Sequence, residues 1–287
     1  MDAKLIKMPT GGLDPQTSPW PDRARCVVML TFDFDAETLW LSRDPRNARR
    51  PGVLSQGGYG GRVAVPRILE LLQEEGLRGT FFVPGWTAEK YTDRMEAIVA
   101  GGHEVGHHGY LHEWIDPDYP DKEREALEKG LEALKSTVGI KPAGFRSPAG
   151  ESSPNMIALL QEYGFLYDSS LMDDVFPYRH TLEGGAPGPV ELPWHWSIDD
   201  APYSLFSIAS PRPLMTNEHI LSIWKAEFRE IYKWGGMINV LTHPQIIGRP
   251  ARLAILREFI AFARSFPGVT FATCEEVARS WAAAEAG

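Results

Sequence analysis

The sequence predicts a single α/β domain of the β/α-barrel type, and two observations support this prediction. Short apolar and β-branched runs of four to seven residues alternate with segments of helical periodicity, which is typical of parallel β/α construction. No linker, change of composition or internal repeat divides the chain. Its 287 residues, 43% of them hydrophobic, are enough for one large core. We therefore expect residues 1–24, rich in Pro, Gly and Asp, to form an irregular N-terminal arm and residues 25–287 to form the domain.

The first half of the chain begins with the strongest strand signal. Residues 26–32 (CVVMLTF) are continuously apolar or β-branched, as in a strand that is buried on both faces. Residues 65–72 have helical spacing and are followed by Gly76, a plausible helix stop. We then expect a strand over residues 80–83, a helix over residues 88–100 and a strand over residues 103–107.

The second half continues the alternation. Residues 121–138 predict a clear amphipathic helix, with acidic and basic side chains paired at helical spacing. The remaining strands are predicted over residues 143–146, 236–241 and 269–272, and the remaining helices over residues 154–163, 216–234 and 250–264.

A glycine-rich stretch interrupts this pattern. Residues 39–62 read as a loop that ends in the run Gly57-Gly58-Tyr59-Gly60-Gly61. Glycines after a strand can form a phosphate cradle, but no Gly-Lys-Ser/Thr follows and the spacing fits no dinucleotide fingerprint. We therefore favour a flexible loop over a nucleotide site.

Charge and composition narrow the partners. The formal net charge of −9 disfavours binding to phosphate backbones and anionic lipid, so we expect neither nucleic acid nor membrane as a partner. The first twenty residues lack the apolar core of a signal peptide, and no stretch approaches the roughly 20 apolar residues of a membrane span. Two cysteines do not indicate a disulfide framework. The sequence therefore predicts a cytoplasmic protein.

Two aspartates at the end of the first predicted strand are the first candidate site residues. Side-chain alternation places Asp33 and Asp35 on one face, with Phe34 on the other. Two crowded carboxylates are costly unless they share a cation or a proton. An Asp-x-Asp by itself is more often a solvated turn.

A histidine cluster strengthens the metal interpretation. His108 and His112 are four residues apart, so one turn of helix would place both imidazoles on one side. Two imidazoles and the Asp35 carboxylate suit Zn²⁺ or another first-row divalent ion and leave a coordination position open. His107 could orient the neighbouring metal ligand through a hydrogen bond. His103 is interpreted as a structural residue that packs at the start of its strand.

Other strand ends add polar side chains. Arg146 could pair with Asp33, and the turn around Pro148 could direct backbone amides at an oxyanion. His243 is suited to protonate a leaving nitrogen, oriented by an acid at position 199 or 200. Trp194 and Trp196 are interpreted equally well as substrate walls or as core residues.

The ordered motifs resemble those of the polysaccharide deacetylase (NodB-homology) family. They are Asp33/Asp35, His108-x-x-x-His112, Arg146-x-Pro148 and Leu241-x-His243, and they span residues 27–244. The resemblance implies a distorted barrel of about seven strands, in which Asp33 is the general base and His243 the general acid. It also implies that Asp35, His108 and His112 hold the metal.

Two departures from the family pattern bear on the substrate. Phe34 separates the two aspartates, and Ala149 replaces an aromatic residue, although its amide could still bind an oxyanion. Both features resemble an intracellular branch with Helicobacter-type peptidoglycan deacetylase, cyclic imide hydrolases and an allantoinase.

The sequence therefore predicts a metal-dependent hydrolase of non-peptide carbon–nitrogen bonds. Its substrate is an N-acetylated amino sugar or, alternatively, a small cyclic imide or ureide. A non-catalytic carbohydrate-binding relative is a third hypothesis, which the full set of acid, base and ligand residues disfavours. We expect Zn²⁺, with Co²⁺, Mn²⁺ and Fe²⁺ as alternatives. The arm could pack on a neighbouring copy in a homo-oligomer.

Overall fold

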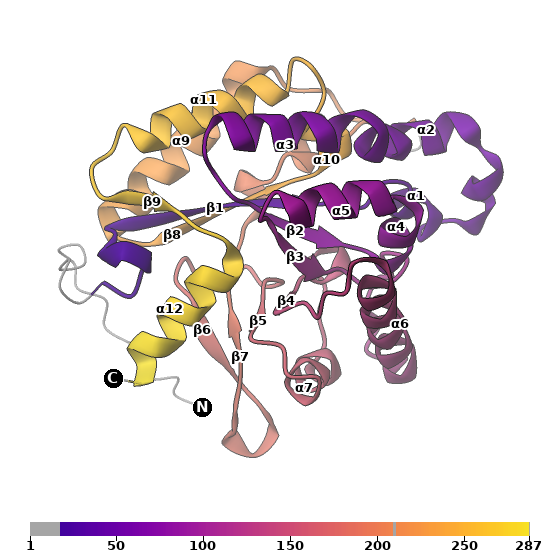
Figure 1. The fold of residues 1–287 in the computed structure, drawn as a ribbon, viewed down its shortest axis with the longest axis horizontal. Coiled ribbons are helices and arrows are strands. Elements are labelled where there is room, and N and C mark those ends of the chain that lie inside the picture. The colour runs from indigo at the N-terminus through magenta and orange to yellow at the C-terminus, as the bar shows by residue number, and fades with distance from the viewer. Residues whose placement is uncertain (1–17, 209–210, 287) are drawn as a thin grey trace.

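A nine-stranded sheet forms the centre of the protein in the computed structural model, which describes residues 18–208 and 211–286 (Figure 1). Its strands run in the order β6-β7-β5-β4-β3-β2-β1-β8, and β9 pairs with β1. All pairs are parallel except β6 with β7. The strands are β1 (Cys26–Asp33), β2 (Thr80–Val83), β3 (Glu104–His107), β4 (Gly144–Phe145), β5 (Tyr167–Asp168), β6 (Tyr178–Thr181), β7 (Pro187–Glu191), β8 (Met237–Thr242) and β9 (Val269–Phe271).

Helices cover the sheet and confirm the predicted α/β class. In Figure 1, α3, α9 and α11 lie together above the sheet, and α6 and α7 lie below it. The α-helices are α1 (Thr38–Leu41), α2 (Pro51–Tyr59), α3 (Val65–Glu74), α4 (Gly85–Lys90), α5 (Thr92–Ala100), α6 (Pro120–Val138), α7 (Pro154–Glu162), α8 (Ala201–Ser204), α9 (Asn217–Trp234), α10 (Pro244–Ile247), α11 (Leu253–Arg264) and α12 (Cys274–Ala286).

The first strand explains how the core is built. All eight residues of β1 are buried, and alternate residues face two different hydrophobic clusters. Val28 and Phe32 pack in the cluster that includes α3 and α11, whereas Val27 and Met29 pack with residues of α12. A strand buried on both faces must be apolar throughout, which is why its sequence signal was strong.

The interpretation of residues 39–62 as a loop is wrong. This segment contains α1, α2 and two short helical pieces, and a π-helical turn over Gly60–Ala64 joins α2 to α3. A Cβ atom on Gly57 would overlap the backbone of Ala36, and one on Gly61 would overlap the ring of Tyr91. The glycines therefore permit close helix packing rather than flexibility or a phosphate cradle.

Several other elements differ from the predictions. The helix expected over residues 88–100 is two helices, α4 and α5, which meet at Tyr91. Strands β5, β6 and β7 and helix α12 were not predicted. β5 has only two residues and β7 contains two prolines, so neither presents a strand-like sequence.

The described part of the predicted arm packs on the same chain. Trp20 is 2% exposed, stacks against Phe176 and Trp281, and donates a hydrogen bond from Nε1 to the carbonyl of Gly235 at 2.8 Å. Residues 1–17 of the arm lie outside the described residues.

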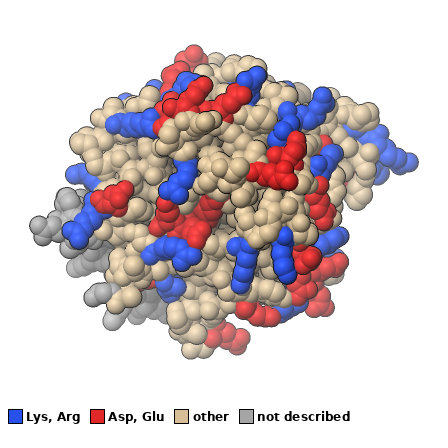
Figure 2. Space-filling model, in the orientation of Figure 1, with Lys and Arg blue, Asp and Glu red and all other residues tan. Residues whose placement is uncertain are grey.

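Charged side chains of both signs are mixed on the face of the molecule that Figure 2 shows. The described part of this face has no continuous basic stripe. Within residues 18–208 and 211–286, no helix is both long and apolar enough to cross a bilayer.

Candidate active site

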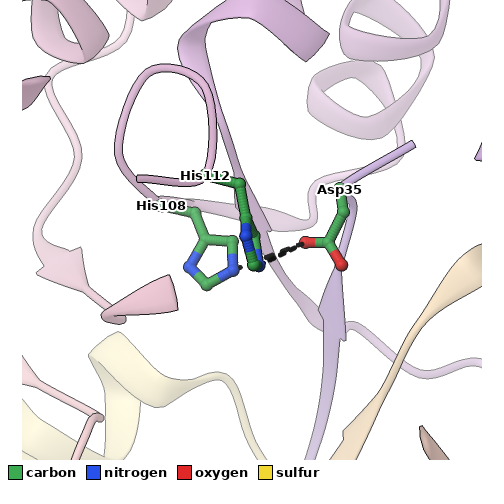
Figure 3. A group of neighbouring side chains, drawn as sticks. All are labelled: Asp35, His108 and His112. Carbon is green, nitrogen blue, oxygen red and sulfur yellow. Dashed lines mark ion pairs between the residues drawn. The ribbon is translucent and has the colours of Figure 1, made fainter. Parts of the chain in front are cut away.

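Asp35, His108 and His112 meet beyond the carboxyl ends of β1 and β3, and we call them the Asp35 cluster. The Oδ1 atom of Asp35 lies 3.4 Å from Nε2 of His108 and 3.8 Å from Nε2 of His112. Figure 3 shows the two rings and the carboxylate pointing toward one another. All three side chains are buried, and their potential donor atoms lie within 4.8 Å of one another. The predicted spatial convergence is therefore present.

The loop after β3 presents the two histidines in a way that was not predicted. Residues 108–112 are not helical, so the expectation that one helical turn aligns His108 with His112 is wrong. The chain instead turns through positive φ angles of 73° at Gly109 and 59° at His112. The Glu113 carboxylate accepts hydrogen bonds from the backbone amides of Tyr110 and Leu111 and so holds this turn.

Hydrogen bonding leaves the cluster's inward atoms available for a cation. Nδ1 of His108 donates to the carbonyl of Arg146 at 2.7 Å, so the lone pair of this imidazole is on Nε2, which faces Asp35. Gln245 donates to Oδ2 of Asp35 at 3.3 Å, while the buried Oδ1 has no hydrogen-bond partner in the described chain. A buried carboxylate oxygen facing two imidazole nitrogens fits a divalent metal ion.

Electrostatics favour the metal-binding forms of Asp35 and His112. Burial would raise the pKa of the Asp35 carboxyl, but the nearby imidazoles of His112 and His108 outweigh it and hold the pKa below its usual range. Burial lowers the pKa of His112 to about 4, against a smaller opposing effect of Asp35. Burial would lower the pKa of His108, but the carboxylates of Asp33 and Asp35 outweigh it and raise that pKa above its ordinary value. An ionised carboxylate and a neutral imidazole are the species that ligate a cation.

The predicted pairing of Arg146 with Asp33 is present. Nη1 of the buried Arg146 donates to Oδ1 of Asp33 at 2.8 Å and to Oγ1 of Thr31 at 2.9 Å. Ser169 and Asn239 accept the remaining guanidinium hydrogen bonds. Asp33 keeps its other oxygen, Oδ2, 3.7 Å from Nε2 of His108.

The partner of His243 is Asp200 rather than Asp199. Nδ1 of His243 lies 2.7 Å from Oδ1 of Asp200 but 3.6 Å from Oδ1 of Asp199, which accepts from the amide of Ala201. Burial would lower the pKa of His243, but the two aspartates outweigh it and raise the pKa well above its ordinary value. Nε2 of His243 lies 3.9 Å from Oδ2 of Asp35.

Asp33, His112, Arg146 and His243 line a small cavity of about 90 Å³. Trp194 and Trp196 both line it, with ring centroids 4.7 Å apart. Trp194 is buried, whereas Trp196 is 42% exposed at the rim. The remaining lining residues are Leu39, Arg43, Ser147, Ala149, Gly150, Asp199, Ala201, Leu205 and Leu241.

The loop after β4 contributes two residues to the lining of the cavity, whereas the predicted residue Pro148 lies outside this lining. Ala149 adopts a φ of 59° and lines the cavity, as does Gly150. Pro148 instead lines a separate cavity with Gly109 and Trp114, so it shapes the turn without facing this pocket. Leu39 and Arg43 were missed because they belong to the segment that was predicted as a loop.

The two remaining histidines of the motif support the backbone. Nε2 of the buried His107 donates to the carbonyl of Leu127 at 3.0 Å, and its Nδ1 accepts from the amide of Gly109. His107 therefore braces the ligand loop but makes no direct hydrogen bond to His108. His103 accepts from the amide of Gly79 at 3.2 Å, in agreement with a packing role.

Comparison with known proteins places this site in a family. The polysaccharide deacetylase family profile matches residues 22–167. The Helicobacter pylori peptidoglycan deacetylase is 30% identical over 88% of this chain and 94% of its own length. A Mycobacterium smegmatis protein provisionally assigned as a polysaccharide deacetylase is 40% identical, with a TM-score of 0.89 over 96% of this chain and 95% of the other.

A third relative is named for a different activity. The crystal structure of the Puue allantoinase is 27% identical, with a TM-score of 0.80 over 99% of this chain and 98% of its own. These relatives confirm the expected enzyme class, which is a hydrolase of carbon–nitrogen bonds. The chain belongs to the polysaccharide deacetylase family.

Proposed function

We propose that this protein hydrolyses the carbon–nitrogen bond of a small cyclic imide or ureide in the cavity beside the Asp35 cluster. One observation carries the proposal. One of three clustered potential metal ligands, His112, lines a small cavity together with an arginine-paired aspartate, an aspartate-paired histidine and two tryptophans. A hydrolytic site requires a general base, a general acid and a group that polarises the carbonyl, and these side chains can fill the three roles.

Asp35, His108 and His112 would hold a divalent metal ion, with Zn²⁺ as the first choice for this ligand set. When bound, the ion would supply Lewis acidity, which makes a water molecule more acidic and polarises a carbonyl group. Metal analysis separates this proposal from a non-catalytic binding module. Asp35→Ala and His108→Ala proteins should each lose the active-site ion and so bind one ion fewer than the wild type, whereas unchanged metal content in both would exclude the proposed site.

Asp33 is the proposed general base. Its Oδ1 atom is held by Arg146, so the carboxylate cannot rotate freely, and Oδ2 is left to accept a proton from the attacking water. Arg146 is itself buried, so the contact between its guanidinium and Asp33 is shielded from solvent.

Two groups would stabilise the products of attack. The turn at Ala149 lines the cavity, and its backbone amide is the proposed donor to the developing oxyanion. His243 is the proposed general acid, because Asp200 holds its Nδ1 and leaves Nε2 to protonate the departing nitrogen. The raised pKa of His243 keeps the imidazole protonated and ready for this step.

The size of the cavity favours a small substrate. A volume of about 90 Å³ bounded by Trp194, Trp196 and Leu241 is suited to a compact ring rather than to a polymer that needs an open polar groove. Arg43 adds a cation that could bind a second carbonyl of such a ring. The allantoinase relative lends further support to a ring substrate.

Deacetylation of an N-acetylated amino sugar is the second candidate, supported by the match to the H. pylori peptidoglycan deacetylase. Both reactions can be measured on the same metal-loaded preparation. We expect ring opening of hydantoin or succinimide to exceed acetate release from chitin oligomers. Acetate release without ring opening would reject the ring and leave the amino sugar as the substrate.

We also propose that the protein is cytoplasmic and that it forms a homo-oligomer. The two cysteines, Cys26 and Cys274, are free and buried, which suits a reducing compartment. Sedimentation of the full chain would test self-association.

A further inference from the structure

A second group of buried carboxylates and a histidine lies outside the proposed active site. Asp168 at the end of β5 pairs in register with Glu191 at the end of β7, and His180 on the adjacent β6 faces both. Nε2 of His180 lies 2.8 Å from Oε2 of Glu191 and 3.7 Å from Oδ2 of Asp168. We call these three residues the Asp168 cluster.

Burial makes the charge of this cluster expensive. Asp168 and Glu191 are fully buried, and His180 is 9% exposed. Within the described residues, no lysine or arginine forms an ion pair with either carboxylate, and His180 is their only ionic contact. Two carboxylates facing one another without water require a shared proton or a bound cation.

The hydrogen bonds of the cluster leave one acceptor unused. Oδ1 of Asp168 accepts from the amide of Ser169 and the hydroxyl of Ser170, and Oε1 of Glu191 accepts from two backbone amides. Oδ2 of Asp168, in contrast, is buried and has no hydrogen-bond partner among the described residues. This atom points into the cluster, toward the imidazole of His180.

The spacing of the inward atoms resembles that of the Asp35 cluster. Ligand bonds of about 2.0–2.1 Å in tetrahedral geometry separate neighbouring donors by about 3.3 Å. The distances of 2.8 and 3.7 Å in the Asp168 cluster bracket this value, and those of 3.4 and 3.8 Å in the Asp35 cluster lie just above it. Two carboxylates and an imidazole form a set that first-row divalent ions accept.

A cation could reach the cluster from outside. His180 lines an open cavity of about 580 Å³ together with Leu171, Thr181 and Ser153, and none of these four residues lines the cavity of the active site. The imidazole therefore connects the buried carboxylates to solvent, which gives an ion an access route.

We propose that Asp168, His180 and Glu191 bind a second divalent cation that has a structural role. Its position explains what such an ion would stabilise. Ser169 accepts two hydrogen bonds from Arg146, and the Ser170 hydroxyl accepts from the amide of Ser147. The ion would therefore fix the segment after β5 that holds Arg146 against Asp33.

Metal stoichiometry on the full chain tests this proposal without reference to activity. After loading with Zn²⁺ and removal of excess ion, plasma mass spectrometry should find two ions per wild-type chain. His180→Gln and Asp35→Ala should each retain one ion, and the double variant none. One ion per wild-type chain that Asp35→Ala removes and His180→Gln retains would overturn the proposal.

Crystals of the metal-loaded wild-type protein provide a measurement that needs no variant. Anomalous difference density at the zinc edge should show a peak between Asp168, His180 and Glu191 in addition to one at the Asp35 cluster. A peak at the Asp35 cluster alone would show that a shared proton neutralises the second cluster.

Discussion

The Asp35 cluster combines one carboxylate with two imidazoles and the Asp168 cluster two carboxylates with one imidazole, and the hydrogen bonds of the two clusters are used differently. In the Asp35 cluster, the protein binds Nδ1 of His108 and Oδ2 of Asp35, and it leaves Oδ1 of Asp35 without a hydrogen bond, 3.4 and 3.8 Å from the Nε2 atoms of His108 and His112. In the Asp168 cluster, four hydrogen bonds from the protein occupy Oδ1 of Asp168 and Oε1 of Glu191.

This difference indicates which cluster can perform chemistry. A catalytic metal site keeps a position open for water or substrate, whereas a structural site is closed by the protein. The cavity beside the Asp35 cluster also contains Asp33 and His243, and it provides that open position. The Asp168 cluster is instead tied to backbone amides, so its loss should affect stability more than turnover. The following predictions test this contrast.

The largest effect is expected from Asp35→Ala. Removal of the carboxylate takes away the charged ligand and leaves two imidazoles, so the protein should lose the active-site ion and measurable turnover. Metal analysis and kcat on the same preparation measure both effects. Asp44→Ala is the matched control, because it removes a carboxylate that pairs with Arg46 and not with the cluster. This variant should retain both the ion and the turnover. Normal turnover by Asp35→Ala would place the chemistry elsewhere.

Asp33→Asn should lower kcat by about 10²- to 10⁴-fold, the usual contribution of a general base. The amide oxygen of Asn can still accept the hydrogen bond from Arg146, so folding and metal content should be preserved. Steady-state kinetics with parallel metal analysis checks this prediction. A variant with nearly normal kcat would show that Asp33 only positions Arg146.

Substitutions of the two neighbouring aspartates should have unequal effects on His243. Asp200→Asn removes the carboxylate that accepts from Nδ1 at 2.7 Å, and kcat should fall by more than about tenfold. Asp199→Asn should have a smaller effect, since its oxygen lies 3.6 Å away and accepts from an amide instead. Equal losses in both variants would contradict the assignment of Asp200 as the orienting residue.

Asp168→Ala should produce the smallest effect on chemistry and a clear effect on stability. It leaves the Ser169 amide without its acceptor in a buried position, which should lower the free energy of unfolding by about 1–3 kcal/mol. Urea unfolding and kcat, measured together, separate the two effects. A collapse of kcat at unchanged stability would contradict the contrast between the clusters.

Much of the site could be predicted because it depends on strands with strong local signals. The continuous apolar run of β1 identified the strand, and side-chain alternation then placed Asp33 and Asp35 together. Arg146 and His243 follow other parallel strands, whose carboxyl ends meet at the same edge of the sheet. The contact between Arg146 and Asp33 could therefore be expected without coordinates.

Other features were hidden because they depend on distant residues. The glycines of residues 57–61 have low helix propensity, yet this segment is helical. Glycine is needed at positions 57 and 61 because Ala36 and Tyr91 lie too close to leave space for a side chain. Asp199 and Asp200 are adjacent and chemically alike, so only the bridge between Asp199 and Leu241 decides which one faces His243.

The amino-acid sequence by itself determined the α/β class, the main buried strands and the residue types of the candidate site, because periodicity and side-chain chemistry are local properties. Only the tertiary structure decided how the loop through Gly109 turns His112 toward Asp35, and that Asp168, His180 and Glu191 form a second cluster. These arrangements depend on packing between segments far apart in the chain, and no local pattern encodes such contacts.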